Sequence, residues 1–478
     1  MTKNKKIEEL KKYSAFIYNK KFQYVLLITL LLIVLVSGSW IRVQNMDLLT
    51  DSTTGKKIPL ALDPYYFLRV AETKIANGGE LPEYDLMRYP SAKVDFTPEI
   101  LPDSVIFLHK AAGLINPEIT LRYINVISPV IFFILGLIVF FFLVYVLTNS
   151  KMTALLSSVF LAFVPTYLYR TMAGFSDHEA IGMFGFFLAL LVYTISLKIV
   201  NKKKTNKKEL YKPVLLGLIT GFFSVFSILS WGGVANFVYM IIPASFFILW
   251  VFRNQKTTKI KNWRRESKIL FYFSWIIGSV LFSWILDYGV DAWIERYFLS
   301  TYGLIVPFVL GFILVDYLLI YLYSEKENLL SKKIKDLKKY RILLSIGIVI
   351  VLGLVFLVLI GKNPFGIVSE TIQRIIRPSG TGRLNETVAE NRAPTLNDWF
   401  SQVGQRFFWI FCAGMIFVGI KFSEKIKNNP KKYLFWVVWS VFIIGTLFSS
   451  ALGGRGYLAN TIYFGSMLLM AGYMVWLY

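Results

Sequence analysis

Residues 123–147 read YINVISPVIFFILGLIVFFFLVYVL, an apolar stretch without a charged side chain. About 20 apolar residues are enough for a helix to cross the ~30 Å hydrocarbon layer of a bilayer. Eleven other stretches of the chain have a similar character, so the sequence predicts an all-α multi-pass membrane protein with about 12 transmembrane helices. The other predicted spans are 23–42, 152–169, 180–199, 213–231, 233–252, 269–287, 302–323, 341–361, 407–421, 433–450 and 457–478.

The composition agrees with a membrane protein and excludes other classes. The chain has 478 residues, of which 55% are hydrophobic and 17% charged, whereas soluble domains are about 45–50% apolar and about 25% charged. The net charge of +23 does not indicate a nucleic-acid partner, because the basic residues form no single patch. The single cysteine, Cys412, excludes a disulfide framework and a cysteine-based metal site.

Basic residues gather in every second loop. They precede the first predicted span and fill the loops between spans four and five, six and seven, eight and nine, and ten and eleven. The positive-inside rule then predicts a cytoplasmic N-terminus in a cell membrane. Three segments are expected on the external side: a long first loop at 43–122, a short loop at 170–179 and a second long loop at 362–406.

Acidic residues stand out in all three external segments. Asp63 precedes a proline, Asp177 and Glu179 come just before a span, and Glu390 lies in the late loop. An unpaired carboxylate at the bilayer boundary is costly, so a partner is expected there. Mg²⁺ and Mn²⁺ are such partners, since they prefer carboxylate oxygens.

A structural interpretation of these acids also stands. Asp177 and Glu179 precede a helix, whose N-terminal N–H groups and dipole favour acids. Asp63 would be an ordinary turn residue and Glu390 a solvated loop acid. His178 would point away from its two acidic neighbours if the segment is extended, so it is not expected to take part.

Five short motifs on the predicted external side of the membrane together resemble the catalytic subunit of oligosaccharyltransferases. Each is short, but their order and spacing make the set specific. They are Asp63-Pro64-Tyr65-Tyr66-Phe67, Arg170-Thr171-Met172-Ala173-Gly174 leading to Asp177-His178-Glu179, Trp231-Gly232-Gly233, Thr387-Val388-Ala389-Glu390 followed by Pro394-Thr395, and Gly453-Gly454-Arg455.

The resemblance implies a glycosyltransferase type C architecture, with residues 1–478 as its transmembrane catalytic domain. It implies transfer of an oligosaccharide from a polyprenyl phosphate or pyrophosphate to the asparagine of Asn-x-Ser/Thr in a polypeptide, within membrane lipids and without nucleic acid. Asp63, Asp177, Glu179 and Glu390 would bind Mn²⁺ or Mg²⁺, and Asp63 and Glu390 would also act on the acceptor amide. Arg455, and with it Arg170, would contact the donor phosphate.

The sequence departs from the family in one respect. The family continues into a soluble external domain whose W-W-D-Y-G motif reads the Ser or Thr at the +2 position of the acceptor, and this sequence has no such motif. We therefore expect the C-terminal soluble domain to be absent, with no acceptor +2 reading in this chain and weak sequon-dependent activity from residues 1–478 alone.

Two other functions remain open at this point. One is another type C glycosyltransferase that moves sugar from a lipid phosphate to a hydroxyl acceptor, which would lack the T-V-x-E segment. The other is a lipid-linked sugar transporter or flippase, which would place its ionisable residues near the membrane midplane. The predicted spans carry few charges, with Asp316 the main exception.

Overall fold

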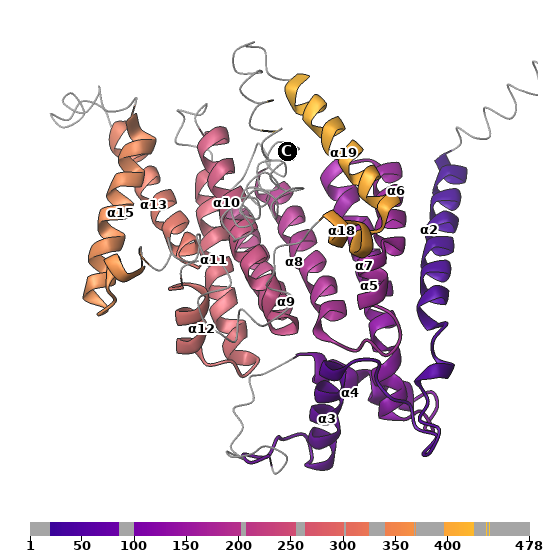
Figure 1. Cartoon of the computed structure of the whole chain (residues 1–478). Helices are drawn as coiled ribbons and strands as arrows, with labels where there is room; N and C mark the ends of the chain where they lie inside the picture. The colour runs from indigo at the N-terminus through magenta and orange to yellow at the C-terminus, as the bar shows by residue number, and fades with distance from the viewer. Residues whose placement is uncertain are drawn as a thin grey trace, which may run out of the picture. The chain divides into compact units, whose positions relative to one another are not determined.

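A computed structural model gives the architecture (Figure 1), which confirms the all-α prediction. Among the residues it describes, nine helices are long and apolar enough to cross a membrane. The chain divides into two compact units, residues 1–191 and residues 192–478. The described residues are 20–85, 100–201, 207–254, 263–300, 303–324, 340–367, 369, 396–424, 436 and 439.

The first unit is built on three packed helices of the membrane part. Helix α2 (Lys20–Val43) packs against both α5 (Leu121–Thr148) and α6 (Lys151–Phe163). Helix α5 begins at Thr120, whose hydroxyl accepts a hydrogen bond from the N–H of Tyr123 at 3.2 Å and so caps a free donor of the first turn. Helix α8 (His178–Val200) follows and continues into the second unit.

The predicted span at 152–169 is not one helix. It is divided into α6, which ends at Phe163, and the six-residue α7 (Pro165–Arg170). The cause is Pro165, because proline disfavours helical backbone in the residue before it. Val164 accordingly adopts an extended conformation, with φ −63° and ψ 127°. Helix α6 alone is shorter than a bilayer crossing.

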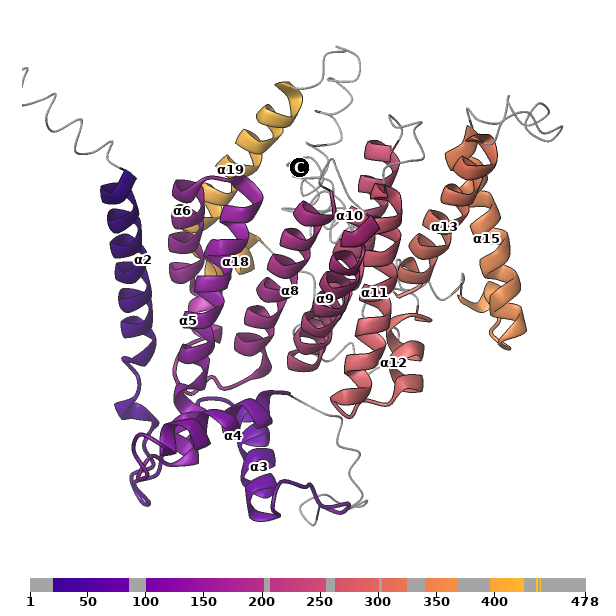
Figure 2. The same cartoon turned by 180° about the vertical axis from the view of Figure 1, so that it is seen from behind.

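The first long loop contains two helices, α3 (Leu62–Ala76) and α4 (Ile100–Gly113), which lie side by side in both views (Figures 1 and 2). Both pack against α5. Leu101 and Val105 of α4 are buried, as expected for a loop whose apolar stretches are covered. The loop is therefore a folded cap attached to the end of α5.

The second unit contains the remaining described helices. The W-G-G segment forms the turn predicted for it: Trp231 follows α9, and Gly232 and Gly233 lie in a short 3₁₀ turn that leads into α10. These helices are α9 (Tyr211–Ser230), α10 (Ala235–Asn254), α11 (Arg264–Ile285), α12 (Val290–Tyr297), α13 (Ile305–Ser324), α15 (Arg341–Leu359), α18 (Leu396–Trp399) and α19 (Gln405–Glu424). The predicted spans at 433–450 and 457–478 lie outside the described residues, apart from isolated positions.

Small residues let α9 and α11 approach very closely. A Cβ atom built on Gly221 would lie 2.7 Å from the backbone carbon of Gly278. One built on Gly278 would lie 2.9 Å from the Cα of Leu218. Trp275 closes the contact by donating its indole N–H to Ser224 Oγ at 3.1 Å. Close backbone approach at small residues is the usual basis of helix association in lipid, where the hydrophobic effect does not drive it.

The Gly221→Ala substitution is expected to destabilise the protein by about 1–3 kcal/mol, the usual cost of overpacking. The added methyl group meets backbone atoms, which cannot rotate away. Gly347→Ala is the matched control, because Gly347 lies in the span of α15 with nothing within 4 Å of the new methyl group. The free energy of unfolding from SDS titration in mixed micelles measures both, and equal effects at the two glycines would contradict the packing argument.

Candidate active site

The predicted D-x-E residues lie together where α8 begins. Asp177 is buried, and its Oδ1 accepts the backbone N–H of His178 at 2.7 Å and lies 2.9 Å from His178 Nδ1. Burial opposes ionisation of Asp177, but the hydrogen bonds and charge of His178 outweigh it, so the pKa of Asp177 lies below its ordinary value. The capping interpretation is therefore correct in part, since Asp177 does serve one N–H at a helix start.

Capping does not account for the rest of the group. One ligand atom from each of Asp177, His178 and Glu179 lies within 4.8 Å of the other two. Glu179 Oε2 is buried and has no hydrogen-bond partner among the described residues. Two adjacent carboxylates with an unused buried oxygen fit a divalent cation, which takes oxygen ligands and offsets their repulsion. The two carboxylates suit Mg²⁺ or Mn²⁺, whereas an imidazole ligand is more typical of Zn²⁺ and similar transition metals.

The expectation that His178 points away from the acids is wrong. The segment is not extended at this point, because α8 starts at His178 and the chain turns. The imidazole therefore comes back against Asp177, and its ring also lies 5.7 Å from that of Phe67 in an edge-to-face contact. The sequence alone suggested an extended geometry, whereas the helix start determines the side on which His178 lies.

Arg170, the last residue of α7, pairs with the same group. Its Nη1 lies 2.7 Å from Glu179 Oε1, and its guanidinium lies 4.8 Å from the centre of the Phe175 ring. The side chain of Arg170 keeps substantial exposure while that of Glu179 is mostly covered. Arg170 thus neutralises one oxygen of Glu179 and still presents N–H groups toward solvent.

The loop before Asp177 is held on one side by the end of α2. Arg42 is fully buried and donates from Nε to Thr171 Oγ1 at 2.7 Å, and its carbonyl accepts the N–H of Ala173 at 2.8 Å. Its guanidinium carbon lies 3.6 Å from the centre of the Phe133 ring, a cation–π contact. Asn45 donates from Nδ2 to the Ala173 carbonyl at 2.8 Å. Arg42 and Asn45 were not among the residues predicted for the site.

Helix α5 holds the other side of this loop. Val126 accepts the N–H of Gly174 at 2.8 Å, and Asn125 Oδ1 accepts the hydroxyl of Ser176 at 2.7 Å. Gly174 has φ +85°, and a Cβ there would lie 2.6 Å from Leu49, so only glycine fits. The sequence signal for this contact is Asn125, an amide side chain within an otherwise apolar span.

Asp63 is brought to the same region but not into the group of three. It is the second residue of α3 and is exposed. Leu60, three residues earlier, donates its N–H to the Gly174 carbonyl at 2.8 Å. Phe67, one turn further along α3, contacts His178, and residues four apart share a helix face. The backbone around Asp63 therefore runs beside the Asp177 loop.

The remaining predicted site residues lie outside the described part of the chain. These are Glu390 in the late loop and Arg455 after the eleventh predicted span. The metal and donor-phosphate roles given to them stay predictions.

Comparison with known proteins gives one family throughout. Residues 27–391 match the family model "Oligosaccharyl transferase STT3, N-terminal". The dolichyl-phosphooligosaccharide-protein glycotransferase of Methanocaldococcus jannaschii is 27% identical over 236 residues, which cover 44% of this chain and 25% of that protein. The subunit stt3 of the Schizosaccharomyces pombe dolichyl-diphosphooligosaccharide–protein glycosyltransferase is 24% identical over 309 residues, which cover 63% of this chain and 35% of that protein.

Solved structures show the same fold. The oligosaccharyltransferase AglB of Archaeoglobus fulgidus, in complex with an inhibitory peptide and a dolichol-phosphate, matches with a TM-score of 0.57 at 20% identity. The match covers 95% of this chain and 50% of that chain, so this chain spans about half the length of that protein. The Archaeoglobus fulgidus enzyme tethered to an acceptor peptide with an NVT sequon matches with a TM-score of 0.52 at 20% identity, over 93% of this chain and 49% of that one. With three quarters of its length matched by the family model, this multi-pass membrane protein belongs to the STT3 family of oligosaccharyl transferases.

Proposed function

We propose that this chain carries the catalytic centre for transfer of an oligosaccharide from a dolichol-type phosphate or pyrophosphate to the asparagine of Asn-x-Ser/Thr. The observation that carries the proposal is the group of Asp177, His178 and Glu179, with its unused buried carboxylate oxygen, in a chain of the STT3 family. The names of its relatives, dolichyl-phosphooligosaccharide-protein glycotransferases, support the donor class.

The proposed site faces the exterior, with the N-terminus in the cytoplasm. Lys20 and Lys21 lie at the start of α2, and Arg42 at its end bonds to Thr171, close to Asp177. A helix of 24 residues is ~36 Å long at 1.5 Å per residue, enough to cross the bilayer. The lysines and the acids therefore belong at opposite ends of one span, and the positive-inside rule assigns the lysines to the cytoplasm.

Asp177 and Glu179 would hold the divalent cation, Mn²⁺ or Mg²⁺, together with Asp63 and Glu390. When bound, the cation supplies positive charge beside the phosphate oxygen that gains charge as the glycosidic bond breaks. Arg170 orients Glu179 through their ion pair. Arg455 and the exposed N–H groups of Arg170 would bind the donor phosphate as charge-assisted donors.

Asp63 and Glu390 would act on the acceptor. An amide nitrogen is a poor nucleophile because its lone pair is delocalised into the carbonyl group. Two carboxylates that each accept an N–H of the acceptor amide favour a rotated amide with a freer lone pair, and such charge-assisted hydrogen bonds are about twice as strong as neutral ones. The exposure of Asp63 beside the Asp177 loop suits a residue that meets a substrate from solvent.

The test uses the purified chain in lipid nanodiscs with a dolichol-linked oligosaccharide and an Asn-x-Thr peptide. We expect Mn²⁺-dependent consumption of the donor, with sugar on the asparagine or released to water, and a fall to background in EDTA. Asp63→Ala and Glu390→Ala should abolish transfer to the peptide. Transfer that persists in EDTA contradicts the metal role, and preferential transfer to a hydroxyl acceptor contradicts the proposed reaction.

A further inference from the structure

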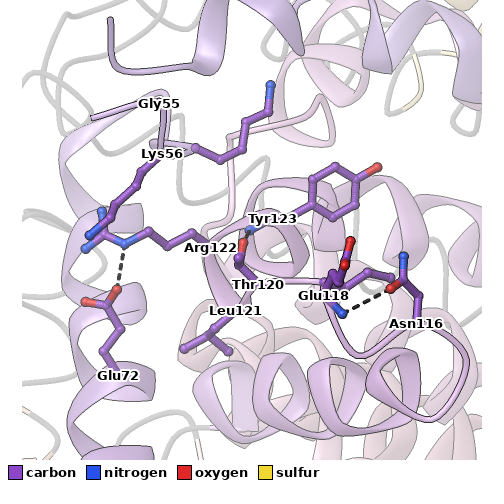
Figure 3. A pocket seen from close by; sticks show the side chains of 11 residues that line it. Gly55, Lys56, Glu72, Asn116, Glu118, Thr120, Leu121, Arg122 and Tyr123 are labelled. Atoms are coloured by element: carbon purple, nitrogen blue, oxygen red, sulfur yellow. Dashed lines mark hydrogen bonds and ion pairs between the residues drawn. The ribbon is translucent and has the colours of Figure 1, made fainter. Parts of the chain in front are cut away.

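A polar cavity lies in the first unit, in the loop between α2 and α5. It has a volume of about 750 Å³ and is bordered by the turn at Gly55–Lys57, by Glu72 of α3 and by residues 116–123, which run into α5 (Figure 3). Three cations and two carboxylates line it: Lys56, Lys57, Arg122, Glu72 and Glu118. The lining therefore carries both signs of charge, with an excess of one cation.

Three of the five charged groups that line this cavity already have partners. Arg122 Nε lies 2.8 Å from Glu72 Oε1, as Figure 3 shows, and both side chains are about one third exposed. Lys57 Nζ donates to the Met46 carbonyl at 2.7 Å and to Thr50 Oγ1 at 2.8 Å, so it fastens the turn after α2. Within the described part of the chain, the ammonium group of Lys56 and the carboxylate of Glu118 have no such partner, and both border the cavity.

The cavity lies at the level of lipid headgroups. Arg122 and Tyr123 belong to the first turn of the α5 span, and the turn at Gly55–Lys57 is joined by hydrogen bonds to Met46 and Thr50, just after the α2 span ends. Apolar side chains of the same segments are exposed: Leu48, between Met46 and Thr50, is 83% exposed, and Leu114 and Ile115, just before Asn116, are 90% and 89% exposed. Bare leucine and isoleucine at a span end are suited to the apolar side of the membrane interface.

The cavity is separate from the candidate active site. Asp63 and Glu72 are nine positions apart on α3, which is 2.5 turns of an α-helix at 3.6 residues per turn. The two side chains therefore project from opposite faces of α3, about 14 Å apart along its axis. Helix α3 thus stands between the Asp177 loop on one face and the cavity on the other.

From these observations we propose that the cavity binds the anionic phosphodiester headgroup of a membrane phospholipid. Lys56 and the outer N–H groups of Arg122 receive the phosphate, and Glu118 accepts hydrogen bonds from a hydroxyl or amine of the headgroup. Leu48, Leu114 and Ile115 face the glycerol and acyl region. A bound lipid would tie the external loop to the start of α5, on the side of α3 opposite the candidate active site.

The experiment measures retained lipid by native mass spectrometry of the chain after titration with phosphatidylglycerol. Lys56→Glu should lower the affinity about tenfold or more, since a charge-assisted contact is lost and a repulsion added. Lys56→Glu with Arg122→Gln should lower it further. Lys110→Glu is the matched control, because Lys110 is an exposed lysine of α4 outside the cavity, and it should bind as the wild type does.

Three results would overturn the proposal. Equal retention by the wild type and Lys56→Glu, with unchanged thermal unfolding midpoints, would show that the cavity takes no lipid phosphate. Displacement of phosphatidylglycerol by dolichyl phosphate at equal concentration would make it part of the donor site. Equal affinity for water-soluble glycerol phosphate would make it a site for a free anion. If the double variant fails to fold, Lys56→Glu alone decides, since the ammonium group of Lys56 has no partner to lose among the described residues.

Discussion

Asp177→Asn is expected to lower the affinity of the chain for Mn²⁺ by about 100-fold or more. The replacement has nearly the same volume, so the buried position stays filled, but the negative charge is lost. Replacing a residue that only hydrogen-bonds to a metal ligand already lowers metal affinity by about 10–100-fold. Replacing a ligand itself should lower the affinity at least as much. Isothermal titration with MnCl₂ gives the affinity directly and does not depend on transfer activity.

Thermal unfolding provides a second measurement of the same prediction. A ligand that binds only the folded state stabilises it by about 2.7 kcal/mol at 100 times its Kd. The wild type should therefore unfold at a higher temperature in saturating Mn²⁺, while Asp177→Asn should not respond. Without metal, the replacement relieves the repulsion between Asp177 and Glu179 but also weakens the contacts with His178 that hold the pKa of Asp177 low. The Mn²⁺-induced shift, and not the metal-free unfolding temperature, therefore tests the prediction.

The matched control for Asp177 is Asp103→Asn. Asp103 is also an acid of the first long loop, but it is exposed and pairs with Lys74 at 2.6 Å. Its replacement should leave Mn²⁺ binding and the Mn²⁺-induced shift unchanged. If Asp177→Asn also binds Mn²⁺ like the wild type, the acids at the start of α8 are a structural cap, and the metal role in the proposed reaction is lost.

The membrane fold was largely predictable because it depends on local composition. The apolar stretch at 123–147 became α5 with small shifts at its ends, since hydropathy alone determines where a chain can cross lipid. The stretch at 152–169 is divided into two helices because Pro165 breaks it, a local signal that an average over the stretch conceals. Helices α3 and α4 of the first loop were not predicted, because their apolar faces become meaningful only against α5.

The candidate site was predictable only as far as its residues are neighbours in sequence. Asp177 and Glu179 stand two positions apart, so their proximity follows from the chain itself. Arg42 and Thr171 are 129 positions apart, and their hydrogen bond depends on how α2 packs in the bundle. A charge buried at the end of a span is a recognisable signal for such a contact, although the partner cannot be named from sequence.

Asp316→Ala is expected to destabilise the protein by about 3–5 kcal/mol, the usual effect of removing one partner of a buried ion pair. Asp316 lies within the α13 span and is 1% exposed. Its Oδ1 accepts from Arg341 Nε at 2.8 Å, and its Oδ2 accepts from the Trp250 indole at 2.9 Å. The substitution therefore leaves a largely covered guanidinium without its countercharge and a buried indole N–H without its acceptor.

Replacing both Asp316 and Arg341 should be less damaging than replacing Asp316 alone. Much of the loss is the cost of the abandoned charge rather than the strength of the pair, so removing both charges should restore part of the stability. The double variant Asp316→Leu with Arg341→Met should therefore unfold at a higher SDS fraction than Asp316→Ala.

Glu295→Gln is the control, because Glu295 pairs with Lys362 at 2.6 Å on an exposed surface and should change stability by less than about 1 kcal/mol. If Asp316→Ala is as mild as the control, α10, α13 and α15 are held by apolar packing alone. If it is severe and the double replacement recovers stability, Asp316 joins the three helices through its bonds to Arg341 and Trp250.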